Sequence, residues 1–140
     1  MTDQPMTSAV IYHVWFATKR RKWLLQGDIE ERIKELLLDT AHHHGIHILA
    51  LETVIDHVHV LLRLNGSQNL SMSMNLLKGV SARRVFEEFP DLKLDAHTEH
   101  FWQKRCGSKP VPPEAISAVT SYIRTQKERL EKYERPFRGR

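Results

Sequence analysis

Two closely spaced histidines are the residues of this chain that most suggest chemistry. His57 and His59 lie two residues apart in the run Asp-His-Val-His-Val-Leu-Leu, which begins at Asp56. Val58 and Val60 alternate with them, which predicts a strand whose histidines project together from one face while the aliphatic residues face a core. Imidazole is the commonest metal ligand in proteins, so the pair predicts a metal site to which both histidines contribute a ligand. From these residues alone, a solvated histidine pair on an edge strand remains the alternative.

A tyrosine and a glutamine form a second pair further along the chain. Tyr122 and Gln126 are four residues apart in a stretch with apolar residues at Ile116, Val119, Ile123 and Leu130. This spacing predicts a helix that stacks the two polar side chains on one face, on a flank of the apolar stripe. Both could then point into a cleft. The alternative is that Tyr122 borders the core and Gln126 is plain surface.

The remaining elements predict how these residues are positioned. Alternating apolar residues predict strands at 10–18, 46–55 and 57–64, with a less regular fourth strand at 101–111. Apolar residues at helical spacing predict a helix from an N-cap at Asp28 to Gly45, another from Leu70 to before Pro90, and a third that Pro112 and Pro113 open. Residues 91–99 are expected to form a connecting loop.

The resulting order, β-α-β-β-α-β-α, predicts the fold class. Its first six elements match the ferredoxin-like (RRM-like) α+β plan, an antiparallel sheet with two helices on one face. The last helix is then expected to cover the other face, where His57 and His59 emerge. We expect one domain over residues 1–140, with flexible ends at 1–9 and 133–140.

Composition and charge narrow the class of protein. The chain has 140 residues and a net charge of +4, from 21 Lys and Arg against 17 Asp and Glu. Its single cysteine, Cys106, excludes an internal disulfide and a cysteine-based zinc cluster, and fits a cytoplasmic location. No apolar run approaches the roughly 18 residues of a membrane span, so no membrane partner is expected.

The positive charge is unevenly placed, which suggests a polyanionic partner such as nucleic acid. One cluster is Lys19-Arg20-Arg21-Lys22, and a looser one consists of Lys78, Arg83 and Arg84. Both are candidate DNA-phosphate contacts. Trp15, Trp23, Phe101 and Trp102 are candidate base-stacking residues, although a core position is the favoured interpretation for each. Ordinary solvated faces would explain the basic clusters equally well.

Together these motifs resemble a known family. His57-Val58-His59, then Lys78 to Arg84, then Tyr122-Ile123-Arg124-Thr125-Gln126 follow one another in the order and spacing typical of the single-tyrosine HUH transposases of small insertion sequences. This is the TnpA family, with its REP-associated tyrosine transposase relatives, and the resemblance extends from about Val10 to Lys132. One departure is Ile55, where relatives often have a proline. The 101–111 strand also matches poorly.

The resemblance implies roles for individual residues. His57, His59 and Gln126 would be metal ligands for Mg²⁺ or Mn²⁺, of which Mn²⁺ suits two nitrogen ligands at least as well. Tyr122 would be the nucleophile, giving a 5′-phosphotyrosine linkage and a 3′-hydroxyl. The substrate would be single-stranded DNA with hairpins at the ends of the element. A homodimer is also implied, in which the tyrosine helix can complete the histidine site of the partner.

Two other classes of function compete with a metal-dependent DNA strand transferase. A DNA-hairpin-binding regulator could keep the fold without cleaving DNA. Such a protein would be expected to have lost residues needed for cleavage, but His57, His59, Tyr122 and Gln126 are all present. A histidine-triad phosphoesterase would need a third alternating histidine, and that position is Leu61. A phosphoesterase with two His-x-Ser/Thr motifs is excluded because the chain has no such pair.

Overall fold

An antiparallel sheet forms the centre of the computed structural model, which describes residues 9–128. The strands are β1 (Val10–Thr18), β2 (His47–Val54), β3 (His57–Leu64) and β4 (Trp102–Pro110), in the spatial order β2-β3-β1-β4. Every neighbouring pair is antiparallel. With the helices between them, this is the predicted ferredoxin-like plan, so the predicted fold class is confirmed.

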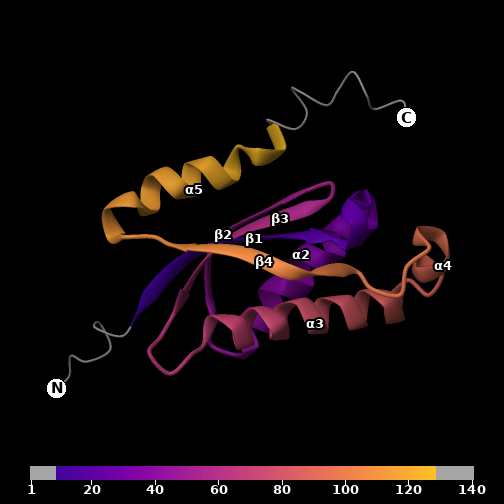
Figure 1. Cartoon of the computed structure of the whole chain (residues 1–140), viewed down its shortest axis with the longest axis horizontal. Helices are drawn as coiled ribbons and strands as arrows, with labels where there is room; N and C mark the ends of the chain where they lie inside the picture. The colour runs from indigo at the N-terminus through magenta and orange to yellow at the C-terminus, as the bar shows by residue number, and fades with distance from the viewer. Residues whose placement is uncertain (1–8, 129–140) are drawn as a thin grey trace.

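Two long helices cover one face of the sheet (Figure 1). They are α2 (Gly27–His43) and α3 (Leu70–Glu88), whose buried residues recur at helical spacing, such as Ile33 and Leu37 on α2 and Met74 and Leu77 on α3. Val14 of β1 is among the strand residues that face them. Helix α2 ends where predicted, because Gly45 adopts the left-handed conformation that favours glycine, at φ 69°.

The last helix lies on the opposite face of the sheet, as predicted. A 3₁₀ turn (Pro113–Ala115) leads into α5 (Ile116–Arg124), which Figure 1 shows above the sheet, across from α3. The fully buried Ile123 packs there against Leu61, Ala50 and Val111. Leu61 lies on the same face of β3 as His57 and His59, away from α2 and α3, so α5 lies over the face that carries the histidines.

Three local predictions were wrong. Asp28 is not an N-cap, because α2 begins one residue earlier, after Gln26. Residues 91–99 are not all loop, since they contain α4 (Leu92–Ala96). The last helix is not continuous, because a turn at Thr125 separates α5 from the helical residues 126–128.

Some predictions fall outside the residues that the structure describes. The flexible ends predicted at 1–9 and 133–140 lie outside them except for Ala9, and so does Leu130 of the predicted apolar stripe. Among residues 9–128, no helix has the length and apolarity that crossing a membrane requires.

Candidate active site

The two histidines lie side by side on β3, on the face that α5 covers. Their ring centroids are 5.0 Å apart. The strand alternates as predicted, because Val58 and Val60 point toward α2 and α3 and belong to the main core. His59 is only 8% exposed, so the histidines are not a solvated pair on an edge strand. Strand β3 is also an inner strand, between β2 and β1.

Asp56 fixes the orientation of His57. The carboxylate oxygen Oδ1 of Asp56 lies 2.8 Å from Nδ1 of His57, and Oδ2 pairs with Nε of Arg21 at 3.2 Å. The buried Thr18 holds the turn from the other side, since its backbone amide donates to the carbonyl of Asp56 at 2.9 Å. The hydrogen bond at Nδ1 makes Nε2 the atom of His57 that would reach a metal.

Ile55 begins this turn in an unusual conformation. Its φ is 39°, which is uncommon for a β-branched side chain. Its carbonyl accepts from the amide of Leu25 at 2.9 Å, which helps to hold the turn. Proline is fixed near a φ of −65°, so it could not adopt this conformation. The turn before His57 therefore differs from one built on a proline at this position.

His13 is a site residue that sequence reasoning missed. It lies on β1 opposite Leu61 of β3, and its Nε2 is 3.0 Å from Nδ1 of His59. The signal was present in the alternation of β1, where Val14 and Phe16 face the core and His13 therefore faces the other side. What the sequence lacked was the pairing of β1 with β3.

Burial keeps these two imidazoles neutral at neutral pH. Desolvation is the main cause that lowers the pKa of His59 to about 4, with repulsion from His57 and His13 adding to it. The pKa of His13 is also lowered, first by desolvation and then by Lys109. With both rings neutral, a single proton is shared across the 3.0 Å contact. When Nδ1 of His59 donates that proton, Nε2 carries the lone pair that a metal needs.

Tyr122 of α5 stands over the histidines. Its ring centroid lies 5.9 Å from that of His59 and 5.9 Å from that of His13, edge-on to both. Gln126 follows one turn later, and its Nε2 donates to the carbonyl oxygen of Tyr122 at 3.0 Å. The tyrosine remains 42% exposed, so it is accessible from solvent as well as close to the histidines.

One cleft of about 580 Å³ joins these side chains. His57, His59, Tyr122 and Gln126 all line it, so the four residues predicted from two distant motifs share one site. Arg21 lines it too, together with Arg105 of β4, which sequence reasoning missed. The remaining lining residues are Trp15, Phe16, Ala17, Gln103, Cys106 and Gly107. Among the described residues that line the cleft, none is acidic.

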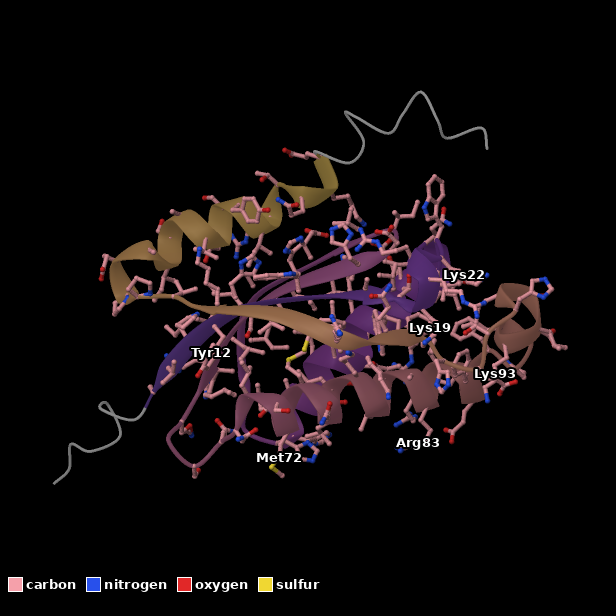
Figure 2. All side chains as sticks on the ribbon, viewed as in Figure 1. Tyr12, Lys19, Lys22, Met72, Arg83 and Lys93 are labelled. Atoms are coloured by element: carbon pink, nitrogen blue, oxygen red, sulfur yellow. The ribbon has the colours of Figure 1, made fainter. Side chains whose placement is uncertain are left out.

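The other predicted basic residues lie elsewhere. Lys19 and Arg20 line a separate hollow with Lys93 near α4, and Figure 2 shows Lys19, Lys22 and Lys93 at that end of the molecule. Figure 2 also shows Arg83 on the α3 side of the sheet, away from α5. Arg84 pairs with Glu88 of the same helix at 3.3 Å.

Lys78 is placed differently from the exposed cations. Lys78 is only 8% exposed, and its Nζ donates to the backbone carbonyls of Gln103, Lys104 and Arg105 at 2.7, 3.1 and 3.4 Å.

The candidate base-stacking residues also include both buried and exposed side chains. Phe101 and Trp102 are buried in the core, while Trp15 is exposed and borders the cleft.

The donor set of the cleft fits a divalent metal. His57 and His59 can present Nε2, and the amide oxygen of Gln126 is a neutral third donor on the same cleft. Within residues 9–128, no group of three His, Cys, Asp or Glu side chains could hold a metal. A third protein ligand here would therefore have to be a donor of another type, such as the amide oxygen of Gln126.

Comparison with known proteins gives consistent matches. The family model of IS200-like transposases matches residues 6–126. The ISDra2 transposase TnpA of Deinococcus radiodurans is 30% identical over 115 residues, 82% of this chain and 82% of that protein. The IS200 transposase of Salmonella typhimurium is 32% identical over 91 residues, which cover 65% of this chain and 60% of that protein.

Solved structures agree with the sequence matches. A crystal structure of a protein from Deinococcus radiodurans R1, described as a transposase, superposes with a TM-score of 0.72 at 30% identity, covering 90% of this chain and 97% of that one. A REP-associated tyrosine transposase bound to a REP hairpin superposes with a TM-score of 0.64 at 13% identity, covering 92% and 72%, and shares the fold. On the match over residues 6–126, this chain belongs to the family of IS200-like transposases.

Proposed function

We propose that this transposase cleaves and rejoins single-stranded DNA through a covalent bond to Tyr122. The observation that carries the proposal is the position of the tyrosine ring, 5.9 Å from His59 in a cleft that also contains His57, Gln126 and two arginines. A phenol, a set of metal ligands and cations for phosphate binding are the groups that this reaction requires.

Cleavage would proceed by displacement at one phosphorus atom. The Tyr122 oxygen forms a bond to the scissile phosphorus, the phenol loses its proton, and the bond from phosphorus to the 3′ oxygen breaks. The products are a 5′-phosphotyrosine and a DNA end with a 3′-hydroxyl, which takes up a proton. Attack by another 3′-hydroxyl on the phosphotyrosine reverses these steps, so DNA is rejoined without ATP.

The metal site would consist of His57, His59 and Gln126, with Mg²⁺ or Mn²⁺ bound. When present there, the cation would polarise the scissile phosphate and stabilise the negative charge that develops on its oxygens. The chain supports these ligands with Asp56, which holds His57, and His13, which contacts His59. Arg21 and Arg105 line the same cleft and would bind neighbouring phosphates.

The proposed substrate is single-stranded DNA with hairpins at the ends of the element. The support is the REP-associated relative that was solved with a hairpin and shares this fold. Basic residues outside the cleft, including Lys19, Arg20 and Arg83, are the candidates for contacts to the hairpin backbone. The proposal also includes a homodimer in which α5 can be exchanged between protomers.

A non-cleaving regulator that binds DNA hairpins is the alternative. It would bind the same DNA and would need neither Tyr122 nor the histidines. The two functions therefore differ in whether protein becomes covalently joined to DNA.

The deciding experiment is incubation with hairpin-bearing single-stranded DNA from the ends of the element, with Mn²⁺ or Mg²⁺, followed by a denaturing gel. We expect a covalent protein–DNA band that Tyr122→Phe abolishes. Tyr12→Phe is the matched control, because Tyr12 lies on the opposite face of the sheet and packs against the main core. His57→Ala should abolish the band and leave hairpin binding largely intact. Hairpin binding by wild type without any covalent band would favour the regulator.

A further inference from the structure

We propose that the Trp15 indole, lying on the backbone of Gly107, is a stacking surface for the DNA base next to the scissile phosphate. This inference rests on the proposed function and identifies a part of the substrate that the cleft would bind. It assigns a specificity role to a residue outside the metal ligands and the tyrosine.

Trp15 occupies the centre of the open sheet face. It pairs with His59 of β3 on one side and with Gly107 of β4 on the other, so His59, Trp15 and Gly107 form one row across three strands. Neighbouring strands are about 4.8 Å apart. The indole is therefore one strand away from a proposed metal ligand, a separation suited to the nucleotide adjacent to the one being cleaved.

Gly107 allows the indole to lie against the strand. A Cβ at this position would be 2.2 Å from both Cε2 and Nε1 of Trp15, and 2.5 Å from Cζ2. No side chain larger than glycine fits beneath the ring in this position. Contact with the backbone of β4 on one side, and with the His13 ring at a centroid distance of 4.9 Å, fixes the orientation of the indole.

A purely structural role does not explain why Trp15 is exposed. The side chain is 37% exposed, while the nearby aromatic residues Phe16 and Trp102 are buried. Helix α5 packs against β2 and β3, on the far side of β1 from Gly107. The indole therefore borders an open part of the cleft rather than the helix interface.

The surroundings of the indole indicate a nucleobase rather than another flat ligand. Arg21 and Arg105 line the same cleft, and none of the described lining residues is acidic. An aromatic ring beside cations that can follow a phosphate backbone is the arrangement with which proteins bind single-stranded nucleic acid. A base stacked on Trp15 would hold its neighbouring phosphate near Tyr122.

The test measures single-turnover cleavage of a labelled single-stranded oligonucleotide over a range of protein concentrations. Trp15→Ala should raise the half-saturating concentration roughly 5- to 140-fold, as expected for loss of one stacked base. Trp15→Phe should recover part of this loss, and Gly107→Ala should resemble Trp15→Ala because it displaces the indole. Leu38→Ala is the control and should behave as wild type, since Leu38 is an exposed apolar residue of α2 that does not line the cleft.

Abasic substitutions along the oligonucleotide separate stacking from a structural effect. One abasic position beside the cleavage site should weaken wild type about as much as Trp15→Ala does, and should have no further effect on Trp15→Ala. The proposal would be overturned if every abasic substitution weakened Trp15→Ala as much as it weakens wild type. An unchanged half-saturating concentration in Trp15→Ala would overturn it as well. If Trp15→Ala does not fold, Trp15→Phe and the wild-type abasic series decide by the same criterion. Absence of a covalent adduct in wild type would instead contradict the proposed function.

Discussion

At the scale of single residues, hydrogen bonds at Nδ1 distinguish the two histidines of β3 from ordinary surface histidines. His57 contacts Asp56 and His59 contacts His13, at 2.8 and 3.0 Å. Partners of this kind fix the ring orientation and the tautomer of a metal-binding histidine. Asp56 also joins His57 to Arg21, so one carboxylate connects a proposed ligand with a proposed phosphate contact.

Replacing Asp56 should therefore weaken metal binding before it affects the fold. We expect Asp56→Ala to reduce Mn²⁺ affinity about 10- to 100-fold, because His57 loses the group that orients it. Isothermal titration calorimetry with the DNA-free protein measures this directly, without reference to activity. Asp95→Ala on α4 is the control, since Asp95 is exposed and does not line the cleft. Unchanged Mn²⁺ affinity in Asp56→Ala would show that Asp56 does not support a metal ligand.

At the scale of elements, the irregularity of β4 explains the burial of Lys78. Between the pairs Phe16–Cys106 and Thr18–Trp102, β1 advances by two residues and β4 by four. The extra residues of β4 form a bulge whose carbonyls converge on the Lys78 ammonium. Gln103 and Arg105 of this bulge line the cleft, so Lys78 shapes the site from the opposite face of the sheet.

Removing the ammonium should destabilise the protein. Burial removes water from the Lys78 ammonium and lowers its pKa. The hydrogen bonds to the carbonyls of β4 compensate for this loss of hydration. We expect Lys78→Met to lower the free energy of unfolding by about 2 kcal/mol, because three backbone carbonyls of β4 lose the donor that they share. Chemical denaturation measures the change, with Arg83→Met on the same helix as an exposed control that should have little effect. Weaker DNA binding by Lys78→Met at unchanged stability would instead support the phosphate contact predicted from the sequence.

The strands of the sheet differ in how far the sequence alone could predict them. Alternation in β1 and β3 predicted both strands to the residue, and with them the face of His57 and His59. The bulge in β4 depends on the register with β1, which no pattern within residues 101–111 encodes. His13 and Arg105 were missed for this reason, because their place in the site depends on which strands are neighbours.

At the scale of the whole molecule, α5 is attached by few contacts. Ile123 is the buried residue of its described part, and the cluster around it is small beside the core under α2 and α3. After the turn at Thr125, Lys127 forms an ion pair with Glu30 of α2, whose carboxylate also accepts from the Thr53 hydroxyl at 2.5 Å. An element held in this way can be exchanged between two copies at low cost, because the partner's helix would make the same contacts.

Exchange of α5 in a homodimer can be tested by mixing two inactive variants. Tyr122→Phe lacks the proposed nucleophile and His57→Ala lacks a proposed ligand, so neither should form a covalent adduct alone. In a co-expressed equal mixture, half of the dimers contain both variants, and exchange gives each of these one intact site. About a quarter of the wild-type adduct should therefore return. A mixture of His57→Ala with His59→Ala should stay inactive, because each histidine site then carries a defect. An inactive first mixture would mean that each tyrosine serves the histidines of its own chain, as the 5.9 Å separation from His59 within one chain allows.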